Sequence, residues 1–343
     1  MDEEDLNTDL PATTDYDFLI ADPKDPCGKT LYLSWIVDLY PGNNYLSEQK
    51  FSRTTDGVNW ITPIIAVPPP SQEIIDKYNG DVGPQGLNFT LLNNPDKYYS
   101  KIIGIFPLVI GANTQDIPLN PFYSTFSLDQ GDTWYTPITL GNQNTTVNGQ
   151  AVDPNDFSQL IRAGDTIPAL ASNVKKNYVF VVTQENSLIR NDVPCGIFLY
   201  VSNDGALSWI KLGQVNRVPA VQTFNQSLSL LDNGKLAISY YDFRNYAGNN
   251  TDQFLTTDRW LDIYSFEHDK LTFETELRLT DVSFDFRKAP TLTAAGSISP
   301  AGKFLGDYLE QTTFKNKIYA SYPIVPVVTN NNPSDIQLSI VEY

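Results

Sequence analysis

Apolar and polar residues along this chain follow the two-residue period of β-strands, in short runs that turn-forming residues separate. The clearest runs are residues 30–37, 102–110, 178–182 and 236–241, which are rich in Val, Ile, Leu and Tyr. Branched and aromatic side chains of this kind suit pleated, buried surfaces. A helical period is almost absent, and one short helix is expected at residues 72–78. The pattern therefore predicts an all-β fold.

The expected strands group into units of about 60–75 residues, each with an inner strand, a Tyr-rich apolar strand and a hairpin. One such unit makes one four-stranded blade of a β-propeller. The five units that can be read lie at residues 18–67, 87–140, 166–209, 220–279 and 306–342. The long connections leave room for a sixth blade. A β-sandwich is the rival fold, but it does not explain why the hairpin is repeated.

The hairpin is best defined at residues 127–134, which read Ser-Leu-Asp-Gln-Gly-Asp-Thr-Trp. Asp and Gly tolerate left-handed backbone angles, and short polar side chains can satisfy the N–H groups of a loop. We expect Trp134 to cover the turn with its ring while its indole N–H finds a polar partner. These roles are structural, so the motif indicates the fold and not a ligand site.

The hairpin motif recurs along the chain at a spacing of about 65–75 residues. Residues 202–209 repeat it with Ala206 in the glycine place and Ser208 in the threonine place. A weaker copy ends at Trp60, and a worn copy spans residues 265–273 with Phe in place of Trp. The residues that we expect to hold the two best copies are Ser127, Asp129, Gly131, Trp134, Ser202, Asp204 and Trp209.

Composition and charge narrow the class of protein. The 343 residues are 41% hydrophobic and 12% aromatic, which suits one β-rich domain over residues 15–343. The acidic segment 1–14 is expected to complete the last blade and close the ring. A net charge of −17 argues against a nucleic-acid partner, because binding phosphates requires clustered Lys and Arg.

Few residues suit metal or cofactor chemistry. A single histidine, His268, and two cysteines without a close-spaced motif, Cys27 and Cys195, predict no metal site and no cofactor. Whether the two cysteines pair is open. Residues 153–156 offer oxygens for Ca²⁺, but such a polar cluster is more typical of a plain loop. The four N-x-S/T sequons, about as many as chance would place here, begin at Asn88, Asn144, Asn225 and Asn249.

The first residues lack the basic and then apolar stretch of a secretory signal, and no run of about 18 apolar residues occurs. We therefore expect no membrane insertion. The cytosol, a particle, and export with a leader that precedes this sequence all stay open.

Motifs in the fourth and fifth units resemble those of a known family. The strand end at residues 240–245 reads Tyr-Tyr-Asp-Phe-Arg-Asn, and residues 257–260 read Thr-Asp-Arg-Trp. Arg-Leu-Thr at residues 278–280 and Phe-Leu-Gly-Asp-Tyr at residues 304–308 follow. With the hairpin motif, which is similar to the Asp-box or BNR repeat, these stretches resemble a subgroup of sialidase-like β-propellers. The resemblance covers most of residues 15–343 and is most specific over residues 215–310.

The resemblance implies a demanding site if the protein is a sialidase. Three arginines would grip the substrate carboxylate, a Tyr activated by a Glu would be the nucleophile, and an Asp would be the acid. The family's first arginine sits in a Phe/Tyr-Arg-Ile-Pro motif in the first blade. That motif does not occur there, and only Asn216-Arg217-Val218-Pro219, at the start of the fourth unit, is similar to it.

The candidate site residues are polar side chains at strand ends, where loops face the propeller axis. The candidate substrate-binding residues are Arg162, Arg244 and Arg217, and the candidate catalytic residues are Asp242, Asp307 and Tyr308. Further polar candidates on this face are Asp38 and Asp165, while Arg287 and Lys288 are interpreted as a solvated loop.

Three functions fit this sequence. The first is a glycan-recognising propeller without hydrolase activity, for example a surface, virion or other particle-assembly component, with a glycan or glycoprotein as its partner. The second is an exo-sialidase-type glycoside hydrolase. The third is a structural propeller whose face docks another protein. The missing first-blade arginine favours the first over the second.

Overall fold

The computed structural model describes residues 12–39, 45–95, 97–110, 121–140, 149–164, 167–186, 195–246, 254–292, 302–326 and 334–343. The chain divides into two compact units, residues 1–145 with 295–299, and residues 146–294 with 300–343. We call them unit 1 and unit 2 and describe each by itself.

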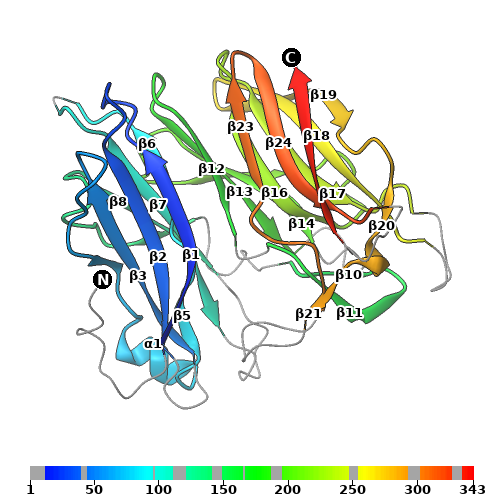
Figure 1. Cartoon of the computed structure of the whole chain (residues 1–343), viewed down its shortest axis with the longest axis horizontal. Coiled ribbons are helices and arrows are strands. Elements are labelled where there is room, and N and C mark those ends of the chain that lie inside the picture. Colours follow the sequence, from blue (N-terminus) through cyan, green and yellow to red (C-terminus); the bar gives the residue numbers. More distant parts are fainter. Residues whose placement is uncertain are drawn as a thin grey trace. The chain divides into compact units, whose positions relative to one another are not determined.

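Unit 1 holds two antiparallel sheets (Figure 1). The strands of the first, in order across the sheet, are β1 (Ala12–Ala21), β2 (Leu31–Leu39), β3 (Leu46–Thr54) and β4 (Ile64–Val67). The strands of the second are β5 (Val82–Pro84), β7 (Lys101–Ile110), β8 (Phe122–Ser127) and β9 (Ile138–Thr139), with β6 (Asn88–Leu92) also paired to β7. The predicted short helix, α1 (Gln72–Lys77), follows β4 and precedes β5 along the chain.

Unit 2 holds three more sheets that follow the chain strand by strand. The first is formed by β12 (Ala169–Asn173), β13 (Tyr178–Glu185), β14 (Gly196–Ser202) and β15 (Ile210–Gln214). The second is formed by β16 (Thr223–Leu230), β17 (Leu236–Asp242), β18 (Thr256–Glu267) and β19 (Lys270–Arg278), with β20 (Phe284–Asp285) paired to β18. The third is formed by β23 (Glu310–Phe314), β24 (Lys317–Ile324) and β25 (Asp335–Glu342).

This succession of antiparallel sheets, most of them with a path of four strands, confirms the predicted fold class, an all-β chain built as β-propeller blades. The strands β1–β4 fall within the predicted first unit, residues 18–67, except that β1 begins earlier, at Ala12. Within the described residues no helix is long and apolar enough to span a membrane. The strand β1 takes in Ala12 and pairs with β2, whereas residues 1–11 lie outside the described residues, so ring closure by residues 1–14 stays a prediction.

A small mixed sheet in unit 2 differs from the expectation. Its strands, in order, are β10 (Ala151–Asp153), β11 (Asp156–Arg162), β22 (Gly302–Phe304) and β21 (Thr291–Leu292), and β11 and β22 run parallel. The sequence indicated only a plain loop at residues 153–156, because such short strands carry no clear period. The predicted last unit begins at residue 306, but its first strand is β23, and residues 306–308 form a connection.

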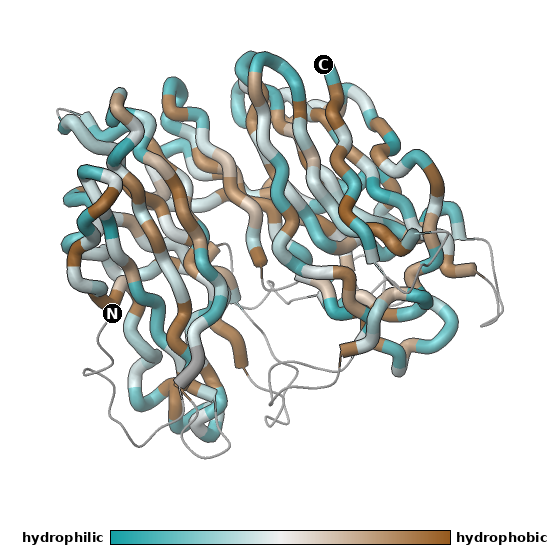
Figure 2. The backbone as a smooth tube through the Cα atoms, in the orientation of Figure 1, coloured by the Kyte–Doolittle hydropathy of each residue, from teal (hydrophilic) through white to brown (hydrophobic). Residues whose placement is uncertain are grey.

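The middle strands β7, β13 and β17 are buried on both faces. Nearly every residue in them is buried, which explains their continuous apolar sequences. The outermost strands β15 and β19 are mostly half-buried or exposed. Figure 2 shows the corresponding apolar stretches along the strands and the polar turns that join them.

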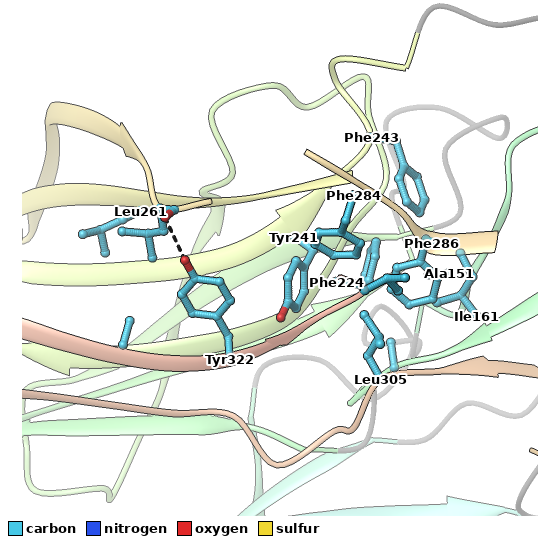
Figure 3. Close-up of a cluster of buried hydrophobic side chains, with 14 of the residues drawn as sticks. Ala151, Ile161, Phe224, Tyr241, Phe243, Leu261, Phe284, Phe286, Leu305 and Tyr322 are labelled. Atoms are coloured by element: carbon cyan, nitrogen blue, oxygen red, sulfur yellow. Dashed lines mark hydrogen bonds between the residues drawn. The ribbon is translucent and has the colours of Figure 1, made fainter. Parts of the chain in front are cut away.

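The largest core cluster of unit 2 joins β16, β17, β18 and β24 (Figure 3). The rings of Phe224 and Tyr241 stack at 5.7 Å, and the Phe286 ring meets Phe224 edge-on at 5.5 Å. At its other end the Tyr322 hydroxyl donates to the Leu279 carbonyl at 2.8 Å. Burying one such aromatic side chain contributes roughly 1.5–3 kcal/mol, so this cluster dominates the packing of unit 2.

Three hairpin loops share one hydrogen-bond pattern. In the loop of residues 127–134, the Ser127 hydroxyl accepts from the Gly131 N–H at 2.7 Å and donates to Asp129 at 2.8 Å. The other carboxylate oxygen of Asp129 accepts from the Thr133 hydroxyl at 2.6 Å. The loop of residues 202–209 repeats these three bonds at 2.8, 2.8 and 2.6 Å. The loop of residues 54–60 has equivalents at 3.0, 3.0 and 2.7 Å, with Asn59 in the threonine role.

Two details of the hairpins differ from the expectation. The indole N–H groups of Trp134 and Trp209 have no hydrogen-bond partner within the described residues. Trp134 instead packs its ring against those of Phe51 and Phe89, with centroids at 5.4 and 5.8 Å, and this packing turns the N–H away from polar groups. Residues 265–273 form a tight two-residue turn at His268 and Asp269, both with positive φ, in place of the longer loop.

The glycine of the best hairpin permits a stability test. Gly131→Ala is expected to lower the free energy of unfolding by about 2 kcal/mol or more. Gly131 has a φ of +92°, and a Cβ there would lie 2.1 Å from the Phe51 ring. In Gly28→Ala the φ is +62° but the space is open, so only the backbone cost of about 1–2 kcal/mol applies. Urea unfolding of both variants checks this, and equal losses would contradict a role for the ring contact.

Candidate functional site

Arg162 and Asp307, which the sequence predicted separately, come together in unit 2. The parallel pairing of β11 with β22 sets Arg162 beside Phe304. The Arg162 guanidinium lies 5.0 Å from the centroid of the Phe304 ring and 3.9 Å from an Asp307 carboxylate oxygen. We call Arg162, Phe304, Asp307 and Tyr308 the Arg162 group.

Asn225 on β16 holds the two segments that carry the Arg162 group. Its side-chain oxygen accepts from the Gly164 N–H, and its side-chain NH₂ donates to the Gly306 carbonyl at 2.8 Å. Asn225 lies in an irregular part of β16 with a φ of +54°, a conformation that Asn tolerates better than most residues. The segments after β11 and β22 are thereby tied to the inner strand of a blade.

Arg162 is held less tightly by carboxylates than Arg244 and Arg287 are. Its side chain is 29% exposed, and the nearest carboxylate among the described residues is 3.9 Å away. The corresponding distance is 2.6 Å for both Arg244 and Arg287. Tyr308, which follows Asp307 in the chain, is 54% exposed. The segment that approaches Arg162 thus also carries an exposed phenol ring.

Asp242 and Arg244 belong to a second group on the neighbouring blade. Arg244 donates from Nε to Asp242 and from Nη1 to Glu276, both at 2.6 Å, and it lies 4.0 Å above the Trp260 ring. Its Nη2 is 3.4 Å from the Tyr240 hydroxyl. Two carboxylates therefore already neutralise this guanidinium.

Burial governs the protonation of the Arg244 surroundings. Burial raises the pKa of Asp242 to about 6 even though Arg244 lowers it. Burial lowers the pKa of Arg244, but the charge of Asp242 and the bond to Glu276 outweigh this and raise it above its usual value. Arg244 therefore stays charged, and Asp242 is the group of this pair that titrates near neutral pH.

Tyr240 touches a carboxylate, because its hydroxyl donates to Asp262 at 2.5 Å. It is completely buried, and burial with the charge of Asp262 raises its pKa. Burial also raises the pKa of Asp262 to about 7. A buried phenol with a raised pKa is a poor nucleophile toward a bound sugar.

The third predicted arginine, Arg217, joins the second group through its backbone. Its N–H donates to the Tyr240 hydroxyl at 3.0 Å, and its guanidinium lies 4.8 Å from the Phe273 ring. Arg217 and Arg244 thus gather around Tyr240, whereas Arg162 belongs to the other group. The clamp and catalytic roles of all six candidates stay predictions.

The other sequence candidates lie elsewhere. Asp38 is buried in β2 of unit 1, and Asp165 lies outside the described residues. Lys288 is exposed and reaches Asp285 at 4.0 Å. Asp153, proposed and set aside as a Ca²⁺ ligand, binds Arg287 through both oxygens at 2.6 and 2.8 Å. Burial raises the pKa of Asp153, but these bonds outweigh it and lower the pKa below its usual value.

In the part of the chain that the structure describes, no cluster of three His, Cys, Asp or Glu residues is placed to hold a metal ion. Cys27 is exposed and Cys195 is buried, and neither forms a disulfide within the described residues. Asn88 and Asn225 are buried, so neither sequon can accept a glycan in the folded protein. Asn144 and Asn249 lie outside the described residues.

The sequence analysis missed Arg259, which is 1% exposed in the core of unit 2. It donates to the Asn225 carbonyl at 3.1 Å and to the hydroxyls of Ser227 and Ser239 at 3.0 and 2.9 Å. Its guanidinium also lies near the Tyr241 and Tyr322 rings. These contacts make Arg259 the support of the irregular strand that carries Asn225. The Thr-Asp-Arg-Trp motif contained it, but no local pattern marked its burial.

No protein-family model matches the chain, and no curated protein sequence matches it. Among solved structures, a protein of unknown function from Dyadobacter fermentans is 14% identical over 96% of this chain and 95% of its own, with a TM-score of 0.50. The GH93 α-L-arabinofuranosidase of Fusarium graminearum is 12% identical over 96% and 93%, with a TM-score of 0.48. A leech intramolecular trans-sialidase is 8% identical over 96% and 61%, with a TM-score of 0.43. At 14% identity, the likeness to the Dyadobacter protein shows a shared fold alone.

Proposed function

We propose that this chain is a glycan-binding β-propeller of the Asp-box, sialidase-like kind, and that the Arg162 group contacts the glycan. The observation that carries the proposal is the state of Arg162. It is positioned by Phe304 and by the β11–β22 pairing, yet it is half-exposed and holds its carboxylate neighbour only at 3.9 Å. A guanidinium in this state retains donors for a ligand.

The chemistry of the Arg162 group suits a sugar. A guanidinium fork can donate to neighbouring hydroxyls or to a sugar carboxylate, and the exposed Tyr308 ring offers a face to the C–H side of a pyranose. The Asp307 carboxylate can accept from sugar hydroxyls. The negative charge of Asp307 also offsets the positive charge of Arg162, so a ligand of this group need not be acidic.

The second group supports binding in preference to hydrolysis. Arg244 is engaged by Asp242 and Glu276 at 2.6 Å, so using it as a carboxylate clamp would require breaking two strong ion pairs. Tyr240 is buried and has a raised pKa, so it cannot serve as the activated tyrosine. The three hairpin loops support the Asp-box assignment, because each repeats the same hydroxyl and carboxylate bonds.

The test is a glycan array probed with the full chain and with the variants Arg162→Ala and Tyr308→Ala. We expect binding to a subset of glycans that is weakened about ten-fold or more in both variants, because a lost charged hydrogen bond costs roughly 1.5–3 kcal/mol. The exposed residues Lys176 and Tyr98 provide matched controls, and Lys176→Ala and Tyr98→Ala should bind as the parent does.

Absence of binding across neutral and acidic glycans would contradict the proposal. Binding that survives in Arg162→Ala would place the glycan elsewhere on the protein. Release of a fluorophore from an α-sialoside by the parent protein, lost in Tyr308→Phe, would favour the hydrolase instead.

A further inference from the structure

A pocket of about 160 Å³ opens in unit 2 on the side of the mixed sheet opposite the Arg162 group. Ile161 and Lys303 line it, whereas the next residues along the two strands, Arg162 and Phe304, face each other on the other side. Successive side chains of a strand point to opposite faces of its sheet. The pocket and the Arg162 group are therefore two separate places.

The floor of the pocket is apolar and rigid. It is formed by Ile161, Leu255 and Phe286, which are 2%, 1% and 1% exposed and belong to the largest core cluster of unit 2. Figure 3 shows Phe286 and Ile161 beside Phe224, against whose ring Phe286 packs edge-on. A floor of this kind offers flat apolar surface without adjusting to its ligand.

One wall of the pocket is held in place by hydrogen bonds. Arg287 binds both oxygens of Asp153 and lies 3.3 Å from the Tyr246 hydroxyl. Asn155 donates to the same hydroxyl at 2.6 Å. The sequence interpreted Arg287 as part of a solvated loop, but these bonds connect it to β10 across 134 residues of chain.

Other residues of the rim have donor or acceptor atoms that make no hydrogen bond with the described residues. Asp156 uses Oδ1 for the N–H and hydroxyl of Ser158, and its Oδ2 has no hydrogen bond with them. The Gln159 side chain also makes no hydrogen bond with the described part of the chain, although it lines the pocket. Lys303 donates to the Ala289 carbonyl at 3.1 Å and has no carboxylate partner there, which leaves ammonium donors available.

We propose that this pocket binds a single sugar ring, as a saccharide site separate from the Arg162 group. The rim offers a hydrogen-bond acceptor at Asp156, donors at Lys303, and both a donor and an acceptor at Gln159. These groups suit a sugar, because each sugar hydroxyl can both donate and accept a hydrogen bond. The apolar floor suits the C–H face of the ring. The volume lies below the roughly 300–1,000 Å³ of sites for drug-sized ligands, which limits the ligand to one small unit.

The charged side chains of the pocket favour a neutral sugar over an inorganic anion or a metal cation. Asp153 and Asp156 would repel an inorganic anion, and Arg287 and Lys303 would repel a metal cation. A neutral sugar ring is repelled by neither the carboxylates nor the cationic side chains. The inference does not depend on glycan binding by Arg162, because the two places use different residues.

The experiment is saturation-transfer NMR with the full chain and five free sugars: glucose, galactose, mannose, N-acetylglucosamine and glucuronate. We expect transfer to at least one of them, with an affinity reduced about ten-fold or more in both Gln159→Ala and Lys303→Met. Lys315→Met, in the turn between β23 and β24, is the matched control and should leave the affinity unchanged.

Three results would overturn the proposal: no transfer to any of the five sugars, unchanged affinity in both pocket variants, or loss of binding in Arg162→Ala. Gln159 is exposed, so its replacement leaves the fold intact and a lost signal reports on the pocket. Failure of the glycan array together with sugar binding that depends on Lys303 would reject the proposed role of Arg162 and retain the pocket.

Discussion

Arg244→Leu is expected to lower the free energy of unfolding by about 3–5 kcal/mol at pH 8, since breaking a buried ion pair leaves an uncompensated charge. The carboxylate left behind is Asp242, which is 1% exposed and lies 2.6 Å from Arg244. Glu276 on β19 loses the same partner. The measurement is chemical unfolding followed by tryptophan fluorescence.

The size of this loss should depend on pH. Burial raises the pKa of Asp242 in the folded protein to about 6, from 3.8 in the unfolded chain. The folded state therefore binds the proton more tightly, and the stability contributed by Asp242 falls as pH rises from about 4 through 6. Without Arg244 the pKa of Asp242 rises further. The penalty of Arg244→Leu should then be clearly smaller at pH 5, where Asp242 can become neutral, than at pH 8.

Two controls separate the ion pair from the loss of a large side chain. Arg217→Leu removes an arginine that lies over Phe273 and makes no ion pair within the described residues, so it should cost less than about 1 kcal/mol. Adding Asp242→Asn to Arg244→Leu should recover part of the loss and flatten its pH dependence. A penalty that is equal at pH 5 and pH 8 would show that charge is not its cause.

Asp22→Ala is expected to destabilise unit 1 by about 3 kcal/mol or more, because buried donors would lose a charged acceptor. Asp22 is 2% exposed and accepts from four donors. The Tyr32 hydroxyl and the Ser100 N–H reach one oxygen at 2.7 and 2.9 Å. The Ser100 hydroxyl and the Lys24 N–H reach the other at 2.6 and 2.9 Å. This carboxylate thus connects the end of β1 to β2 and to the start of β7.

The measurement is thermal and urea unfolding of Asp22→Ala, Asp22→Asn and Asp17→Ala. The stability of Asp22→Asn should lie between the stabilities of the parent and of Asp22→Ala. The amide oxygen can still accept hydrogen bonds, but the amide NH₂ group is itself a donor and would face other donors. Asp17 is exposed on the same strand, and its replacement should stay within about 0.5 kcal/mol. If Asp22→Ala were as mild as Asp17→Ala, the four hydrogen bonds would not be a major support of unit 1.

The hairpins show what short-range chemistry can predict. Each depends on bonds between residues two to four positions apart, such as Ser127 to Asp129 and Thr133 to Asp129. Such contacts need only the local order of residues, so the motif and its spacing identified the blades in advance. The middle strands were equally clear, because burial on both faces requires an apolar sequence throughout.

The candidate site could be predicted from the sequence only in part. The residue types of the Arg162 group were predicted, but their contact depends on a parallel pairing between strands about 140 residues apart. Asp242 and Arg244 were both predicted as site residues, and the structure pairs them. Glu276, which also binds Arg244, lies on another strand and carries no local signal. The pocket was not foreseen, since its lining comes from β10, β11, β22 and the turn at Phe286.

By itself the sequence determined the all-β class, the blade repeat and the hairpin chemistry, because alternation, turn residues and bonds between near neighbours are local properties. Only the tertiary structure decided which charges are neutralised, which arginine stays exposed and where a pocket opens. These properties depend on burial and on contacts between residues far apart in the chain, and neither leaves a period or a motif in the sequence.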